Sequence, residues 1–180
     1  AELQEIMNVG EEAQIVVKEK VYPGTKIVIS DVSKMYEAPM KRMIRIWLFK
    51  LPDMVMIIDD VQAAEPIQLL TRLVANNRDN KLVTDVSGWT GELLNFHRGE
   101  ETLEAKLLWN ETDGVETPVK LSFDWSYLHE YYHPLPNQAG QGKEGSALVY
   151  VWTGETEGKH HRRVQLLTPG TVKEADFAEQ

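Results

Sequence analysis

The sequence predicts an all-β fold, an antiparallel β-sandwich of two layers with roughly ten or more strands and little helix. Short apolar runs recur along the chain, turn-forming residues separate them, and no internal repeat or long helical hairpin interrupts the pattern. We expect the sandwich domain over residues 1–170. We expect a loosely ordered tail over residues 171–180, because those residues have little to bury.

The first part of the chain predicts two pairs of strands. In AQIVVKEKVYPGTKIVISDV (13–32), two apolar runs flank the Tyr22–Thr25 turn, where proline presets φ and glycine supplies the left-handed conformation. MKRMIRIWLF (40–49) and MVMIIDDV (54–61) flank the Lys50–Asp53 corner, which indicates a hairpin.

The second pair is apolar on both faces. In a strand, Met54, Met56 and Ile58 point to one side, while Val55 and Ile57 point to the other. A sheet that is apolar on both faces has to be covered on both. We therefore expect the outer face of this pair to dock on another part of a larger protein. The alternative is a central strand that lies under a long loop of the same chain.

The stretch EPIQLLTRLVANNRDN (65–80) fits two interpretations. Helical spacing of its apolar residues, with a proline suited to the first turn, permits a helix over residues 66–76. As a strand, the stretch places Leu69, Thr71, Leu73 and Ala75 on one face. Neighbouring strands favour the strand. The later strands are predicted in GELLNFH (91–97), ETLEAKLLWN (101–110), TPVKLSFDW (117–125), SALVYVWTG (146–154) and HRRVQLLTP (161–169).

Composition narrows the classes of function. The net charge of −9 argues against a nucleic-acid or anionic-membrane partner, because both need a basic surface. The absence of cysteine excludes disulfides, cysteine zinc sites and thiol redox chemistry. No apolar run is long enough to span a bilayer. The start, AELQEIMNVGEEAQ, lacks the pattern of a signal peptide and reads as a cut end.

Several segments carry a family resemblance. RIWLFKLPDMVMIIDDVQAAEP (45–66) resembles the arginine strand, Pro-Asp corner and Asp-Asp ending of heparinase II/III-like polysaccharide lyases. ISDVSKMYEAPMKRMIR (29–45) is similar to the run that precedes this corner in that family. GEETLEAKLLWN (99–110) and HRRVQLLTPG (161–170) are similar to its later strands.

The resemblance implies the C-terminal β-sandwich of a larger enzyme. Such lyases join an N-terminal (α/α) toroid to the sandwich and cleave uronic-acid polysaccharides by β-elimination, with the main catalytic residues on the toroid. The implied partners are an acidic polysaccharide and the toroid, and the implied location is secreted or periplasmic. No toroid pattern occurs in this sequence. The chain alone is therefore predicted to be inactive.

The resemblance breaks down at a metal site of that family. The Leu-Leu-His that helps to hold a metal ion there corresponds to TRLVANN (71–77), which has no histidine. Asp31, which resembles the family's metal-site aspartate, would lack its partner. We therefore expect no metal ion and no cofactor.

The segment YLHEYYHPLPN (127–137) contains the H-E-x-x-H pattern of zinc peptidases. That chemistry needs His129 and His133 on one face of a helix, with Glu130 between them. Pro134 pushes the second histidine away from helical geometry. We interpret the segment as a loop with histidine and tyrosine exposed to solvent.

The run HHRR is the densest basic cluster. On a strand, His160 and Arg162 share one face, while His161 and Arg163 share the other. The run either contacts a substrate carboxylate or sulfate or offsets a surface rich in glutamate, and we favour the second. The adjacent carboxylates at 59–60 cannot form one acid–base pair, since they also point to opposite faces. We expect them to end their strand.

Two hypotheses on function follow. The first is the sandwich domain of a uronic-acid lyase, and the alternative is an independent, non-catalytic carbohydrate-binding or scaffold module. The candidates for carbohydrate contact are aromatic or cationic side chains in turn-rich or strand-surface positions: Trp109, Trp125, Tyr131, Tyr132, His133 and Arg162.

Overall fold

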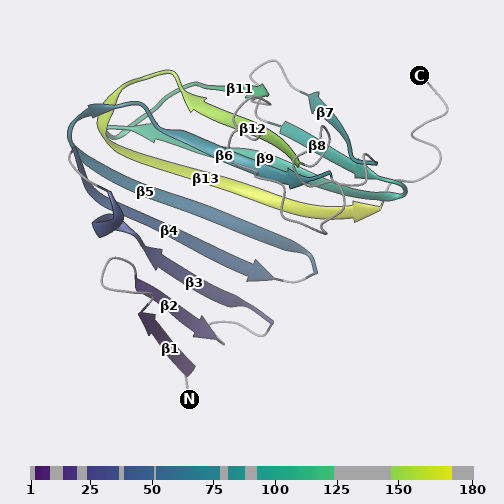
Figure 1. Cartoon of the computed structure of the whole chain (residues 1–180), viewed down its shortest axis with the longest axis horizontal. Helices are drawn as coiled ribbons and strands as arrows, with labels where there is room; N and C mark the ends of the chain where they lie inside the picture. The colour runs from purple at the N-terminus through teal and green to yellow at the C-terminus, as the bar shows by residue number, and fades with distance from the viewer. Residues whose placement is uncertain are drawn as a thin grey trace, which may run out of the picture.

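The computed structural model describes residues 3–8, 14–19, 24–36, 39–50, 52–77, 81–87, 93–123 and 147–171. It confirms the all-β prediction, because two antiparallel sheets form a sandwich (Figure 1). The only helix in the described residues is one 3-10 turn at Ser33–Met35. Across the same residues, no helix has the length and apolar character needed to cross a membrane.

Some predictions fall outside these residues. They concern the zinc-peptidase pattern at 127–137, the candidates Trp125, Tyr131, Tyr132 and His133, and the tail from residue 172 onward. They stay predictions.

Among the described residues, the large sheet has ten strands, and all neighbours run antiparallel. Along the sheet, the order is β1 (Leu3–Asn8), β2 (Gln14–Glu19), β3 (Lys26–Asp31), β4 (Met40–Lys50), β5 (Met54–Ile67), β13 (Gly158–Thr171), β9 (Glu101–Thr112), β8 (Leu93–Arg98) and β7 (Val83–Ser87), with β10 (Val115–Glu116) paired to β9 off this path. The small sheet has the order β11 (Val119–Phe123), β12 (Ala147–Gly154) and β6 (Leu70–Asn76). β13, the last of the described strands in the sequence, therefore lies inside the large sheet.

The two predicted strand pairs are confirmed. β2 pairs with β3, and Gly24 in the turn before β3 has a left-handed φ of 76°. β4 pairs with β5, and the corner between them is closed by a hydrogen bond of 2.8 Å from Asp53 N to Lys50 O.

The ambiguous stretch at 66–76 is a strand rather than a helix. β6 begins at Leu70 and pairs with β12. Leu69 and Thr71 are buried, whereas Leu70 and Arg72 are exposed. The alternation has the period of a strand, as the strand interpretation required.

The hydrophobic core lies between the small sheet and the β8–β9 side of the large sheet. Its buried members are Leu94, Phe96, Ala105, Leu107, Val119, Tyr150 and Trp152. Burying a large apolar side chain stabilises a fold by roughly 1.5–3 kcal/mol relative to leaving it exposed. Phe96 and Tyr150 meet edge to face with ring centroids 5.9 Å apart, and the Tyr150 hydroxyl forms a hydrogen bond with Thr84 of β7.

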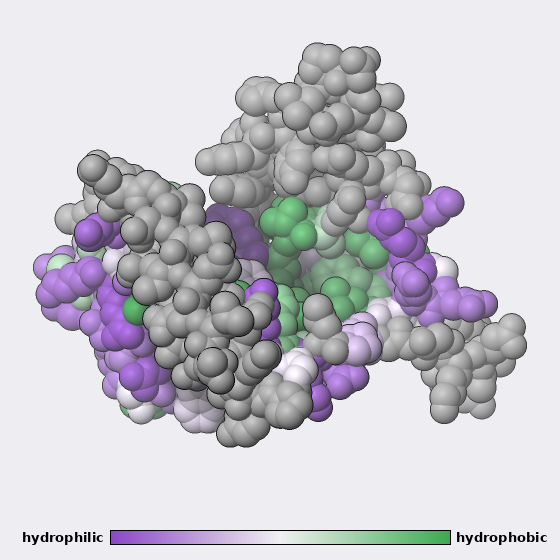
Figure 2. Space-filling model, turned by 90° about the horizontal axis from the view of Figure 1, so that it is seen from below, coloured by the Kyte–Doolittle hydropathy of each residue, from purple (hydrophilic) through white to green (hydrophobic). Residues whose placement is uncertain are grey.

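The small sheet covers only part of the large one. In Figure 1, strands β1 to β4 lie away from β6, β11 and β12. Seen from below, hydrophobic side chains gather in a hollow that hydrophilic side chains border (Figure 2). The molecule therefore keeps hydrophobic surface outside its core.

The direction of the Arg163 side chain on β13 defines the two faces of the large sheet. Arg163 donates to Trp152 O at 2.7 Å and to Leu69 O at 3.3 Å, so its side chain points toward the small sheet. We call this the inner face. Residues that pair with Arg163 across neighbouring strands also point to the inner face. The residues before and after them in the chain point to the opposite face, which we call the outer face.

The outer face carries a continuous apolar surface, which we call the outer stripe. Its members lie in register across β3, β4, β5 and β13: Ile27, Ile29, Ile44, Ile46, Leu48, Met56, Ile58, Val164 and Leu166. Their side chains are half-buried. The inner face of β4 and β5 is apolar too, with Trp47, Phe49, Val55 and Ile57. The prediction of apolar residues on both faces is confirmed.

Candidate functional site

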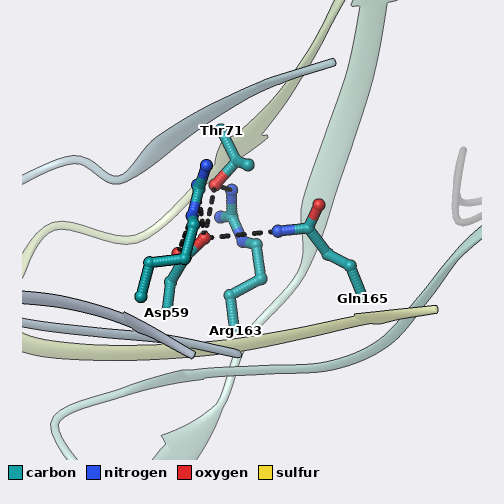
Figure 3. Close-up of polar contacts among 5 residues, drawn as sticks. Asp59, Thr71, Arg163 and Gln165 are labelled. Carbon is teal, nitrogen blue, oxygen red and sulfur yellow. Dashed lines mark hydrogen bonds and ion pairs between the residues drawn. The ribbon is translucent and has the colours of Figure 1, made fainter. Parts of the chain in front are cut away.

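A group of buried and partly buried polar side chains lies between the two sheets (Figure 3). We call it the inner polar network, and its members are Arg45, Asp59, Thr71, Asn110, Arg163 and Gln165. They come from β4, β5, β6, β9 and β13. The fold brings them together because the three central strands pair in register and β6 packs over them.

Arg163 joins the two sheets. Its side chain is 0% exposed and, besides the two carbonyls of the small sheet, it donates from Nη1 to Thr71 Oγ1 at 3.0 Å and from Nε to Asn110 Oδ1 at 2.9 Å. Burial lowers the pKa of Arg163 to about 10, and the nearby charge of Asp59 opposes that shift. The guanidinium therefore stays charged at neutral pH.

Asp59 supplies the compensating charge. Its carboxylate is 2% exposed and accepts from Arg45 Nε at 2.6 Å, from Arg45 Nη2 at 3.0 Å and from Gln165 Nε2 at 3.3 Å. The two-pronged arginine contact is the strong form of an ion pair. Because the carboxylate is sealed between the sheets, it is a structural group and cannot reach a polysaccharide.

The structure corrects the interpretation of the HHRR run as a strand that offsets an acidic surface. The predicted alternation is confirmed, but His161 is only 1% exposed. Its Nε2 lies 3.0 Å from both Ile67 O and Gly158 O, and its Nδ1 lies 3.2 Å from Thr112 Oγ1. Carbonyls only accept, so Nε2 carries a proton and donates to them. One face of the run is therefore part of the interior.

The outer face of the same run is polar. Asp60 lies 2.9 Å from His160 Nε2 and 3.1 Å from Arg42 Nη2. Asp59 and Asp60 thus point to opposite faces, as predicted. The expectation that they end their strand is wrong, because β5 continues to Ile67 between β4 and β13.

The candidate Arg162 lies on this outer face. It is exposed and sits in register with Asp60 of β5 and Glu111 of β9. Within the described part of the chain it makes no hydrogen bond or ion pair. Its role in carbohydrate contact stays a prediction.

The candidate Trp109 lines a cleft of about 560 Å³ at one side of the sandwich. The cleft lies between residues 107–110 of β9, residues 116–120 and Glu155. A β-bulge in β9 opens the cleft. On β13, Val164 pairs with Trp109 and Gln165 pairs with Leu107, so Leu108 has no partner on β13. Leu108 and Trp109 are 42% and 40% exposed as a result.

The inner polar network holds one wall of this cleft. The Asn110 side chain, which accepts from Arg163, donates from Nδ2 to Thr117 O at 3.0 Å and to Thr117 Oγ1 at 2.9 Å. Thr117 N returns a bond of 2.9 Å to Asn110 O, and Glu155 N donates to Pro118 O at 3.1 Å. The wall is therefore fixed before any ligand arrives.

Asp31, the residue that resembles a family metal ligand, has local partners. Its Oδ1 accepts from Ser33 N at 3.0 Å and from Ser33 Oγ at 2.5 Å. These bonds hold the pKa of Asp31 below its ordinary value, first through the Ser33 hydroxyl and then through the Ser33 amide. In the ranges that the structure describes, no three side chains of His, Asp or Glu gather into a metal site.

Comparisons with known proteins find similar solved structures. No protein-family model matches the chain, and no curated protein matches it. Among solved structures, the chain is similar to a mutant of the heparan sulfate lyase HepC from Pedobacter heparinus, with 12% sequence identity and a TM-score of 0.49. The likeness covers 96% of this chain and 22% of the lyase chain.

Proposed function

We propose that this chain is the β-sandwich domain of a larger heparinase II/III-like lyase that degrades uronic-acid polysaccharides by β-elimination. An (α/α) toroid of the same parent chain carries the main catalytic residues. The sandwich stabilises the toroid and forms one wall of the cleft that holds the acidic polysaccharide. The segments of the sequence that resemble this family support the proposal.

The observation that carries the proposal is the outer stripe. A sandwich that faces water on its outer side alternates apolar and polar residues along each strand. Here Ile46 and Ile58 lie on the outer face, while their neighbours Trp47 and Ile57 fill the inner one. A contiguous apolar surface of this kind is typical of a face that packs against another domain.

The alternative, an independent carbohydrate-binding or scaffold module, requires a polar outer face. The outer stripe therefore favours the domain of a larger enzyme. The position of the stripe supports the same choice, because it is centred on β4 and β5, the hairpin that also carries the strongest family resemblance (residues 45–66).

The positions of the described histidines and aspartates also support catalysis by a second domain. β-Elimination needs a group that neutralises the substrate carboxylate, a base near C5 and an acid for the leaving oxygen, all in one cleft. In the described residues, His161 and Asp59 are buried inside the sandwich, and His160 pairs with Asp60 on the outer face.

An activity assay tests the proposal. The isolated chain should give no unsaturated, ultraviolet-absorbing product from heparan sulfate, alginate or hyaluronan, whereas the full parent protein should give it from at least one of them. The coding sequence upstream of residue 1 should encode a long α-helical region. An unrelated upstream region, or full activity in the isolated chain, contradicts the proposal.

A second experiment tests the docking face directly. In the full parent protein, Ile46→Asp with Ile58→Asp should separate the domains, seen as a longer maximum dimension by small-angle scattering and as lost activity. Val83→Asp is the matched control, since Val83 is 63% exposed on β7 and lies outside the stripe. An unchanged shape and activity in the double variant contradicts the role of the stripe.

A further inference from the structure

The cleft beside Trp109 combines one exposed aromatic ring with three charged side chains. Glu116, Lys120 and Glu155 line it, and all three are exposed. Among the described residues, none of the three takes part in an ion pair. Side chains of opposite charge that border one cleft without pairing leave their hydrogen-bonding capacity for a ligand.

An exposed aromatic ring in a cleft of this size suits a sugar. A pyranose presents C–H groups on its face and hydroxyls around its rim. Trp109 offers an amphipathic ring for the face. Carboxylates accept hydrogen bonds from the hydroxyls, and a lysine ammonium donates to the hydroxyl and ring oxygens. The volume of about 560 Å³ falls within the range of ligand sites in proteins.

The charges of the cleft select against an acidic ring. Two carboxylates face one ammonium, within a protein whose net charge is −9. A uronate or sulfate placed here is repelled by Glu116 and Glu155, and only Lys120 attracts it. An uncharged ring meets no such repulsion and uses all three groups.

The cleft is preorganised for this task. Asn110 is 4% exposed and fixes Thr117, and Arg163 fixes Asn110 from inside the sandwich. Ordering of the wall therefore costs little when a ligand binds. Gly154 leaves the space for this arrangement, since a Cβ there would lie 3.2 Å from Arg163 Nη2.

We propose that this cleft is a subsite for an uncharged sugar ring, which stacks on Trp109 and hydrogen bonds to Glu116, Lys120 and Glu155. Trp109 pairs with Val164 of the outer stripe, so the subsite lies at the border of the docking face. The inference deepens the proposed function, because it assigns to the sandwich the neutral units of a polysaccharide. It does not require the toroid, so it stands if the lyase proposal fails.

Binding to the isolated chain tests the subsite. The probes are cellohexaose and chitohexaose as neutral chains, and oligogalacturonate and alginate hexamers as acidic ones. We expect saturable shifts of amide NMR signals from residues 107–110 and 116–120 with at least one neutral probe at millimolar concentration, and weaker shifts with both acidic probes. Tighter binding of the acidic probes, or no saturable binding of either neutral probe, overturns the inference.

Variants separate recognition from folding. Trp109→Ala should weaken binding of the neutral probe about tenfold or more, as loss of a central aromatic contact does, and Trp109→Phe should restore part of it. Val83→Ala, remote from the cleft, should change nothing. Glu116→Gln with Glu155→Gln should shift preference toward the acidic probes, which a purely structural role would not do. Equal binding by Trp109→Ala and the wild type overturns the inference.

Discussion

Strands β4, β5 and β13 place different kinds of side chain on their two faces. Toward the small sheet, these strands bury charge, with Asp59 and Arg163 at 2% and 0% exposed. Away from it, they present Ile46, Ile58 and Val164. In a simple sandwich the interior is apolar and the surface polar. Here the interior of the sandwich also contains charged side chains where the sheets meet, and the outer face of the same strands carries apolar ones.

The inner charges have a geometric reason. Leu69, just before β6, and Trp152 in β12 turn carbonyls toward the large sheet, and a buried carbonyl needs a donor. An arginine can reach both carbonyls and Asn110 at once because its guanidinium carries five donors in a plane. A carboxylate nearby then keeps the charge tolerable in the interior. The polar contacts fix how the sheets sit, and the apolar core supplies most of the stability.

The largest expected contrast is at residues 162 and 163. Arg163→Met should lower the free energy of unfolding by about 3–5 kcal/mol, because it removes the donor to four buried acceptors and a positive charge near the buried Asp59. Arg162→Met, one residue away on the exposed outer face, should change it by less than about 0.5 kcal/mol. Urea denaturation followed by circular dichroism measures both. Similar losses of unfolding free energy in the two variants would contradict the difference between the inner and outer faces.

The next contrast is at residues 59 and 60. Asp59→Asn should cost about 2–3 kcal/mol, since the buried Asp59 carboxylate loses its ion pair with the partly exposed Arg45 while the shape is kept. Asp60→Asn, whose partners Arg42 and His160 reach water, should cost less than about 1 kcal/mol. Chemical denaturation near neutral pH measures the free energy of unfolding of both variants. If the Asp60 variant is as unstable as the Asp59 variant, the ion pairs of Asp60 on the outer face are also buried from water.

A smaller contrast compares apolar neighbours. Ile57→Thr should cost about 1.5–2 kcal/mol, because Ile57 is 4% exposed and a hydroxyl there is buried. Ile58→Thr should cost about 1 kcal/mol or less in the isolated chain, and should reduce the binding of a fluorescent dye that reports exposed apolar surface. Thermal unfolding and dye titration test the pair. If Ile58→Thr binds as much dye as the wild type, the outer stripe is already covered and does not reach solvent.

The smallest expected effect concerns pH. The lowered pKa of Asp31 means that its stabilising contribution is complete above the ordinary carboxyl pKa of 3.8 and is lost as the pH falls through the lowered value. Ser33→Ala should cost about 1 kcal/mol at neutral pH. It should also flatten the acid limb of the stability profile, measured by urea titrations at a series of pH values. An unchanged acid limb argues against the Ser33 bonds as the cause.

The sequence predicted much of the fold, because the signals were local. Strand period, the Gly24 turn and the hairpin corner at 50–53 lie within short windows, and each was confirmed. The ambiguous run at 66–76 was settled as strand by pairing with β12, which follows it by about seventy residues in the chain. Strands β1, β7 and β10 escaped prediction because each is at most six residues long and its stabilising partner is another strand.

The site was predicted less well, for a similar reason. Alternation placed His161 and Arg163 on one face, but their burial depends on Thr112, Asn110 and the carbonyl of Leu69, which are distant in the sequence. Trp109 was selected from its residue type and its place next to a turn-rich stretch. The β-bulge that exposes it and the Thr117 wall beside it carry no sequence signal without the register of β13.

The position of β13 has a consequence for the order of folding. The strand that is made last among those described joins β5 to β9 at the middle of the large sheet. During synthesis, strands β1 to β5 and strands β7 to β9 can each pair early, yet these two groups stay separate until β13 leaves the ribosome. Closure over such sequence distances is slow. Until then, β5 and β9 expose pairing edges, so this part of the nascent chain is most prone to aggregation just before β13 is complete.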